Sequence, residues 1–206
     1  MHELFTQPGR RVFHVAGGQE YPACYLIQDR EGGGILVNTP PFENALLEHL
    51  QQAGGVDHIF LPSHFGALAL DRWRTELQAR SLAWEAEVRH IAGTVDIAIG
   101  RKTRLTRTID FLPMSGRTEG SCALRLRNLP GAIFFGPILS PGASGWPGLQ
   151  ARDDDYSYEN RLIGVLGLQD LKYAYAFTDV FVPGQTRYGP DADQAIQREL
   201  QALLAD

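Results

Sequence analysis

The chain has little cysteine and no long apolar segment. Its 206 residues include two cysteines, Cys24 and Cys122, which are too few for a disulfide framework. We expect both to be small hydrophobic residues in a reducing compartment, and we expect the protein to be cytoplasmic. No apolar run is long enough to cross a bilayer, and the first residues carry no secretory signal pattern. The sequence therefore predicts no membrane association.

An excess of positive charge is also missing. The net charge is −5, which argues against a general nucleic-acid surface. One basic cluster does occur, at Arg101, Lys102, Arg104 and Arg107, and we interpret it as the solvated face of a hairpin. Hydrophobic residues make up 44% of the chain and charged residues 21%, which is typical of globular proteins. This length and composition predict one domain over 1–206 with a sizeable core.

The stretch from Asp57 to Leu70 organises the rest of the chain. Ile59 to Leu61 form a short apolar run that Pro62 stops, and helical spacing of apolar residues follows. The pattern predicts a buried strand, a tight junction and a helix over 67–80. His64 lies at the junction, where α/β folds often carry their chemistry.

Apolar alternation and turn residues predict the other elements. Helices are expected at 42–53, 158–168 and 191–204, and residues 138–158 form a long loop rich in Gly, Pro, Ser and Asp. A hairpin is expected from 96–99 and 104–114. Further strands are predicted at 3–7, 11–16, 22–28, 35–37, 83–87, 121–126, 131–137, 173–177 and 180–182.

Several strand-end loops, taken in order, resemble those of the metallo-β-lactamase superfamily. The segment Ser63 to Ala69 aligns with its T-H-x-H-x-D-H motif, and Pro113 to Ser121 aligns with P-x-x-G-H-T-P-G-S. Gly136-Pro137 stands at a Gly-Asp strand end, and Pro183-Gly184-Gln185 stands at the final P-G-H loop. The resemblance implies an α/β (α+β) fold, a four-layer αββα sandwich of two mixed sheets.

The metal ligands that this resemblance implies are almost all replaced. The seven ligand positions read His64, Gly66, Leu68, Ala69, Arg117, Pro137 and Gln185. Zinc requires imidazole, thiolate or carboxylate ligands, so one histidine cannot hold it. Arg117 also places a permanent cation where a divalent ion would lie. We therefore expect no metal and no other cofactor, and without metal the hydrolytic nucleophile of the superfamily is missing.

The resemblance implies that a vestigial cleft remains, although its catalytic residues are unknown. Its residues are Asn38, Ser63, His64, Arg117, Thr118, Ser121, Pro137 and Gln185. Two alternatives stay open for Arg117. If Glu119 or the run Asp153 to Asp155 pairs with it, the cleft is closed and structural; if neither does, it is a site for a small anion.

Two functional hypotheses follow from this cleft. The first is a non-catalytic binding or scaffold protein whose partner is a small anionic ligand or a protein, a second copy forming a homodimer included. The alternative is an atypical hydrolase of the same superfamily with a mononuclear or metal-free site. No G-x-S-x-G elbow is present for serine chemistry, and Ser63 is near His64 only by adjacency. The run Asp153 to Asp155 could bind Ca²⁺ or Mg²⁺, but we interpret it as a solvated loop.

Overall fold

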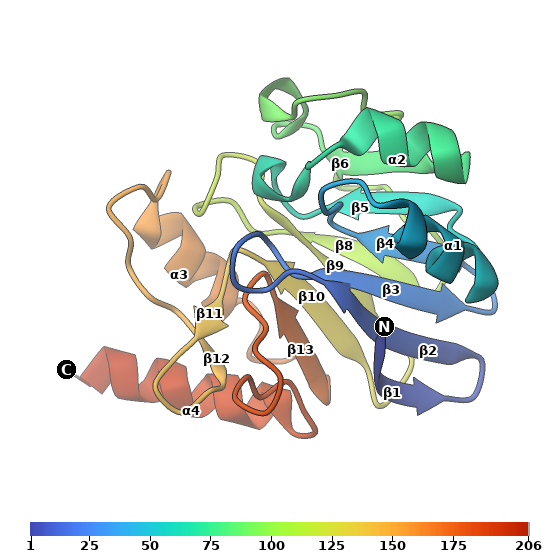
Figure 1. Ribbon diagram of the computed structural model, residues 1–206. Coiled ribbons are helices and arrows are strands. Elements are labelled where there is room, and N and C mark those ends of the chain that lie inside the picture. Colours follow the sequence, from blue (N-terminus) through green and yellow to red (C-terminus); the bar gives the residue numbers. More distant parts are fainter. Residues whose placement is uncertain (206) are drawn as a thin grey trace.

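The larger of two facing β-sheets contains the first half of the chain. The computed structural model describes residues 1–205 (Figure 1). The sheet has seven strands in chain order, antiparallel from β1 to β4 and parallel from β4 to β7. Its strands are β1 His2–Gln7, β2 Arg10–Ala16, β3 Cys24–Asp29, β4 Gly33–Val37, β5 His58–Leu61, β6 Arg80–Trp84 and β7 Ile97–Ile99. Short turns join the antiparallel strands, whereas helices connect β4 to β5 and β5 to β6, as parallel pairs require.

The second sheet has the order β13-β10-β9-β8. Its strands are β8 Ile109–Pro113, β9 Cys122–Leu126, β10 Ala132–Gly136 and β13 Tyr175–Thr178. Only the β10–β13 pair is parallel. Within the connection between these two strands lie a small two-stranded ribbon, β11 Ser140–Pro141 with β12 Pro147–Gly148, and helix α3 Tyr158–Leu166.

Helices cover the outer face of each sheet, which gives the four predicted αββα layers. Helices α1 Asn44–Gln52 and α2 Leu70–Leu77 lie over the first sheet, and α3 and α4 Ala192–Ala205 lie over the second (Figure 1). Short 3₁₀ turns occur at η1 His64–Gly66 and η2 Val88–His90. No helix within residues 1–205 is long and apolar enough to span a membrane.

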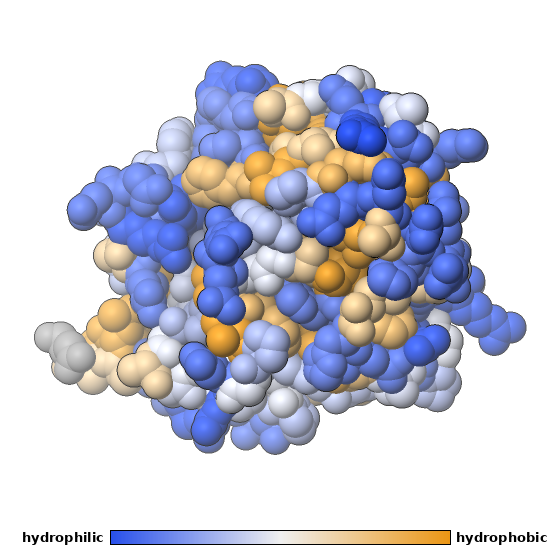
Figure 2. Space-filling view, viewed as in Figure 1, coloured by the Kyte–Doolittle hydropathy of each residue, from blue (hydrophilic) through white to orange (hydrophobic). Residues whose placement is uncertain are grey.

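Alternation along central strands builds three apolar layers. On β10, Phe134 points to the core between the sheets, whereas Ile133 and Phe135 point to the layer under α3 and α4. On β3, Tyr25 and Leu26 divide in the same way between the inter-sheet core and the layer under α1 and α2. Because both faces are covered, these strands read as continuous apolar runs. Hydrophilic residues dominate the outline of the face seen in Figure 2.

The helix expected over 67–80 is shorter than predicted, and the next strand begins earlier. Ala69 and Gln78 have left-handed backbone conformations, with φ of 49° and 54°, and they bracket α2. The chain turns directly from Gln78 into β6, so this strand spans Arg80–Trp84 and not 83–87. Periodicity alone did not show these two left-handed residues.

Two other sequence predictions are wrong. Residues 96–99 and 104–114 form no hairpin, because β7 belongs to the first sheet and β8 to the second. The basic segment between them is the crossover from one sheet to the other. Residues 180–182 are not a strand; the Val182 amide donates to Thr186 Oγ1 at 2.9 Å within a turn.

Candidate functional site

Glu87, which the sequence did not single out, is the centre of the junction after β5. Its side chain has no solvent exposure and accepts four hydrogen bonds. The backbone N and ring Nδ1 of His64 lie 2.8 and 2.6 Å from Oε1, while Thr118 Oγ1 and the Gly120 amide donate to Oε2 at 2.8 and 2.9 Å. The carboxylate therefore ties the His64 turn to the loop that carries Arg117.

Two small polar residues of the expected cleft, Ser63 and Ser121, form hydrogen bonds to the protein's own backbone. Ser63 is buried and its Oγ accepts from the Phe65 amide at 3.3 Å, so it does not pair with His64. Ser121 is also buried and donates to Met114 O at 2.7 Å and Thr118 O at 3.2 Å. These bonds shape the loops and leave neither hydroxyl activated by a base. His64 keeps one third of its side chain exposed.

Arg117 is buried and paired within the chain. Its side chain is 5% exposed, and Nη2 lies 2.7 Å from Asp154 Oδ2 while Nη1 donates to Asp154 O at 3.0 Å. Asp155 Oδ1 lies 3.5 Å from Nη1, and the guanidinium lies 4.9 Å from the centre of the Phe65 ring. The expected pairing with the acidic run is therefore present, and the anion-site alternative for Arg117 is wrong. Glu119 is not its partner; it pairs with Arg89 and His90.

Close packing fills position 66, which the sequence resemblance aligns with a second ligand histidine. A Cβ on Gly66 would lie 1.8 Å from Asn38 Oδ1, far inside van der Waals contact. The Thr39 amide and hydroxyl both donate to Gly66 O, at 2.7 and 3.0 Å, and hold the turn against β4. No side chain, histidine included, fits at 66 while Asn38 stays where it is.

Asn38 and Asp179 form a polar pair where β4 and β13 end. Asn38 has a φ of 61° and donates from Nδ2 to Ala23 O at 2.9 Å and to Asp179 Oδ1 at 2.8 Å. Burial raises the pKa of Asp179 to about 7, although the Asn38 hydrogen bond and the charges of Arg152 and Arg117 act in the opposite direction. Asp179 was also absent from the sequence-based site.

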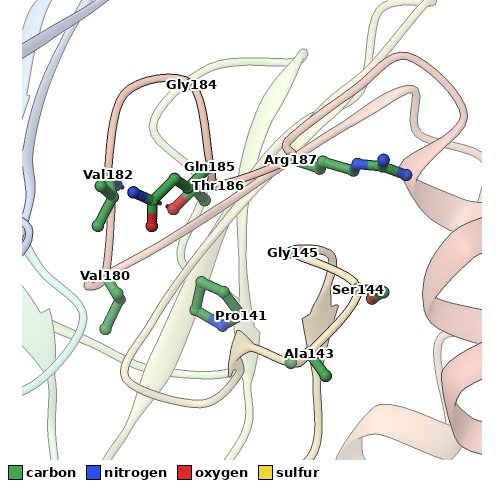
Figure 3. Close-up of a pocket in the computed structure, with 11 residues that line it drawn as sticks. Pro141, Ala143, Ser144, Gly145, Val180, Val182, Gly184, Gln185, Thr186 and Arg187 are labelled. Carbon is green, nitrogen blue, oxygen red and sulfur yellow. Dashed lines mark hydrogen bonds between the residues drawn. The ribbon is translucent and has the colours of Figure 1, made fainter.

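Only three of the eight expected cleft residues line any of the five cavities described, and these three divide between two cavities. Arg117 and Pro137 line one of about 260 Å³, together with Asp179, Phe65, Arg152 and the loop from Gly18 to Pro22. Gln185 lines a separate cavity of about 330 Å³, between the loops 141–145 and 180–187 (Figure 3). Val180 borders both, so the two cavities adjoin. We refer to the first as the Asp179 cavity.

The side chains present do not fit a metal centre. Within residues 1–205, no three His, Cys, Asp or Glu side chains gather closely enough to hold a metal ion. The two cysteines are buried and unpaired, and burial raises the pKa of each thiol, which disfavours the thiolate that a metal needs.

Known structures identify the fold, although the sequence matches no protein-family profile and no curated protein. A Cronobacter sakazakii metallo-β-lactamase with a HARLDQ motif is similar with a TM-score of 0.69 at 12% identity, over 100% of this chain and 93% of that one. A metallo-β-lactamase from Staphylococcus aureus has a TM-score of 0.70 at 11% sequence identity, and the match covers 98% of this chain and 68% of that one. A metallo-β-lactamase family protein from Thermus thermophilus has a TM-score of 0.66 at 18% sequence identity, and the match covers 97% of this chain and 79% of that one. This chain therefore has the metallo-β-lactamase fold, as its loops predicted.

Proposed function

We propose that this chain is a metallo-β-lactamase-fold protein with a degenerate metal site, and that it acts by binding and not by hydrolysis. The observation that carries the proposal is the buried Arg117, which occupies the place of a ligand histidine and is neutralised by Asp154 and Asp155. A guanidinium stays protonated in proteins and has no lone pair to offer a metal ion, so Arg117 cannot replace the histidine as a ligand at any working pH.

The packing of Gly66 supports the same proposal. Zinc needs three protein ligands and a water, or four protein ligands. The turn that would supply the second histidine has no room for a side chain. Restoring one ligand by mutation would therefore not restore a centre.

Zinc competition tests this proposal. The apo protein is titrated with Zn²⁺ in the presence of a chromophoric chelator, beside a His64→Ala variant. We expect the chelator to take the metal equally well in both, because within residues 1–205 no three His, Cys, Asp or Glu side chains, His64 included, gather closely enough to hold an ion. Retention of one Zn²⁺ per chain by the wild type, with loss in His64→Ala, would overturn the proposal.

One observation favours the alternative, a metal-free hydrolase. Glu87 orients His64 at Nδ1, which is how a carboxylate prepares an imidazole as a general base. However, none of the five cavities described includes His64 among its lining residues, and the adjacent Ser63 is turned inward. Turnover of p-nitrophenyl esters in chelator, abolished by His64→Gln, would favour this alternative; we expect none above background.

We also propose that residues 1–206 form a single domain and that the protein is cytoplasmic. Two buried, unpaired cysteines support a reducing compartment. A protein partner, or a second copy of the chain, remains an alternative to a small ligand for this binding function.

A further inference from the structure

The Asp179 cavity contains a carboxylate with no cationic partner. Asp179 accepts one side-chain hydrogen bond, from the neutral Asn38 amide to Oδ1. Among residues 1–205, no basic group lies within 4.0 Å of either carboxylate oxygen. Burial already penalises its charge, as the raised pKa shows. A charged donor from a ligand would therefore bind this carboxylate more strongly than water does.

The same cavity contains a guanidinium with no anionic partner. Arg152 is exposed, and its Nη2 donates to the neutral Ser140 Oγ at 2.6 Å. In the described part of the chain, no carboxylate lies within ion-pair distance of it, in contrast to Arg117 and Arg161 nearby. Arg152 and Asp179 both line this cavity, and they form no ion pair with each other.

We propose that the Asp179 cavity binds a small zwitterion of the amino-acid class, with its ammonium on Asp179 and its carboxylate on Arg152. This inference rests on the proposed binding function. A simple anion would face Asp179 and the exposed Glu20 on the rim, and a simple cation would face Arg152. A molecule that carries both charges bridges the two groups.

The remaining walls fit the rest of such a molecule. Tyr21, Pro22, Phe65 and Pro137 also line the cavity and offer apolar surface to a side chain. The cavity volume of about 260 Å³ suits a ligand smaller than a drug-sized molecule. The loop 17–22 is held beside the segment after β13, because the Phe181 amide donates to Gly18 O at 3.1 Å (Figure 1).

Calorimetry with the twenty free amino acids tests the proposal. The strongest binder is compared with its N-acetyl form, its methyl ester and its glycyl dipeptide. We expect acetylation and esterification each to weaken binding at least about tenfold, since each removes one charge-assisted contact. The dipeptide distinguishes a free amino acid from a peptide as the occupant.

Two variants and a control place the binding in this cavity. Asp179→Asn and Arg152→Gln are each expected to weaken binding at least about tenfold. Arg187→Gln, which changes an arginine of the adjoining cavity, should leave the affinity unchanged (Figure 3). If Asp179→Asn fails to fold, the acetyl and ester comparisons on the wild type still decide the question.

Two outcomes would overturn the inference. One is that no amino acid binds the wild type at concentrations up to ~10 mM. The other is binding that neither variant nor derivative weakens. Either result leaves the proposed loss of the metal site standing, because the zinc competition tests that proposal separately.

Discussion

At the scale of single residues, Glu87 decides the shape of the junction. Its carboxylate is the shared acceptor for the His64 turn and for the loop 117–120. Buried carboxylates are costly unless every oxygen is satisfied, and here each oxygen accepts two hydrogen bonds. The four hydrogen bonds account for a fully buried acidic residue at this junction.

Glu87→Ala is therefore expected to lower the free energy of unfolding by about 3 kcal/mol or more, because several buried donors lose their acceptor. Urea denaturation measures this loss. Glu85→Ala is the matched control, since Glu85 is exposed two residues away, and it should unfold like the wild type. Equal stability of the Glu87 and Glu85 variants would show that the buried carboxylate is not needed.

Asp179 predicts a pH dependence of stability. Its pKa is about 7 in the folded protein against an ordinary 3.8, so folding favours the protonated form. Between these two values the folded state binds more protons than the unfolded state, and stability contributed by this group is lost as pH rises. We expect Asp179→Asn to remove a fall of ~1–4 kcal/mol between about pH 4 and pH 7.

Urea denaturation across that pH range measures the effect. Asp170→Asn, at an exposed position, serves as the control and should keep the wild-type profile. A profile for Asp179→Asn that is parallel to the wild type would contradict the raised pKa.

The sequence identified some site residues and missed two. His64, Asn38 and Arg117 were found because they stand at ligand or strand-end positions of a recognisable pattern. Glu87 lies in Trp-Glu-Ala-Glu-Val, where nothing separates the buried Glu87 from the exposed Glu85. Asp179 did carry a signal, since it is an acidic residue between the two apolar segments predicted as strands at 173–177 and 180–182.

At the scale of elements, the loop before α3 is fastened by two arginines that share Asp155. Arg117 comes from the loop after β8, and the fully buried Arg161 comes from α3. Arg161 also donates to Gln150 O at 3.0 Å and to Ile138 O at 2.7 Å. One carboxylate thus connects the loop that carries Arg117 to the helix layer.

Asp155→Ala is expected to destabilise the protein by ~3–5 kcal/mol, because it leaves buried guanidinium charge without its partner. Thermal unfolding measures the change. Asp153→Ala is the control, since Asp153 is exposed and makes no ion pair within residues 1–205, and it should not change the melting temperature. A wild-type melting temperature for Asp155→Ala would contradict the fastening role.

Element positions were predictable where alternation or periodicity was strong, as in β3, β10 and α3. They were not predictable where one backbone conformation decided the boundary, as Ala69 and Gln78 do for α2. The supposed hairpin after Ile99 failed for another reason. A polar crossover between two sheets and a hairpin turn have the same local sequence signals, and only the sheet partners tell them apart.

At the scale of the whole molecule, the metallo-β-lactamase fold is present, and within residues 1–205 no three His, Cys, Asp or Glu side chains gather to hold a metal ion. The inter-sheet core and the two helix layers depend on apolar alternation, which does not require a metal. The order of strand ends along the chain was enough to predict the αββα architecture. The chemistry of the cleft could not be predicted in this way, because Arg117 pairs with Asp154 and Asp155, which lie far from it along the chain.

Elemental analysis of protein purified without chelator measures whether the chain holds a metal. We expect no stoichiometric zinc, iron or manganese, because one histidine and a buried, paired arginine cannot coordinate them. One or two transition-metal ions per chain, lost on mutating His64, would contradict it.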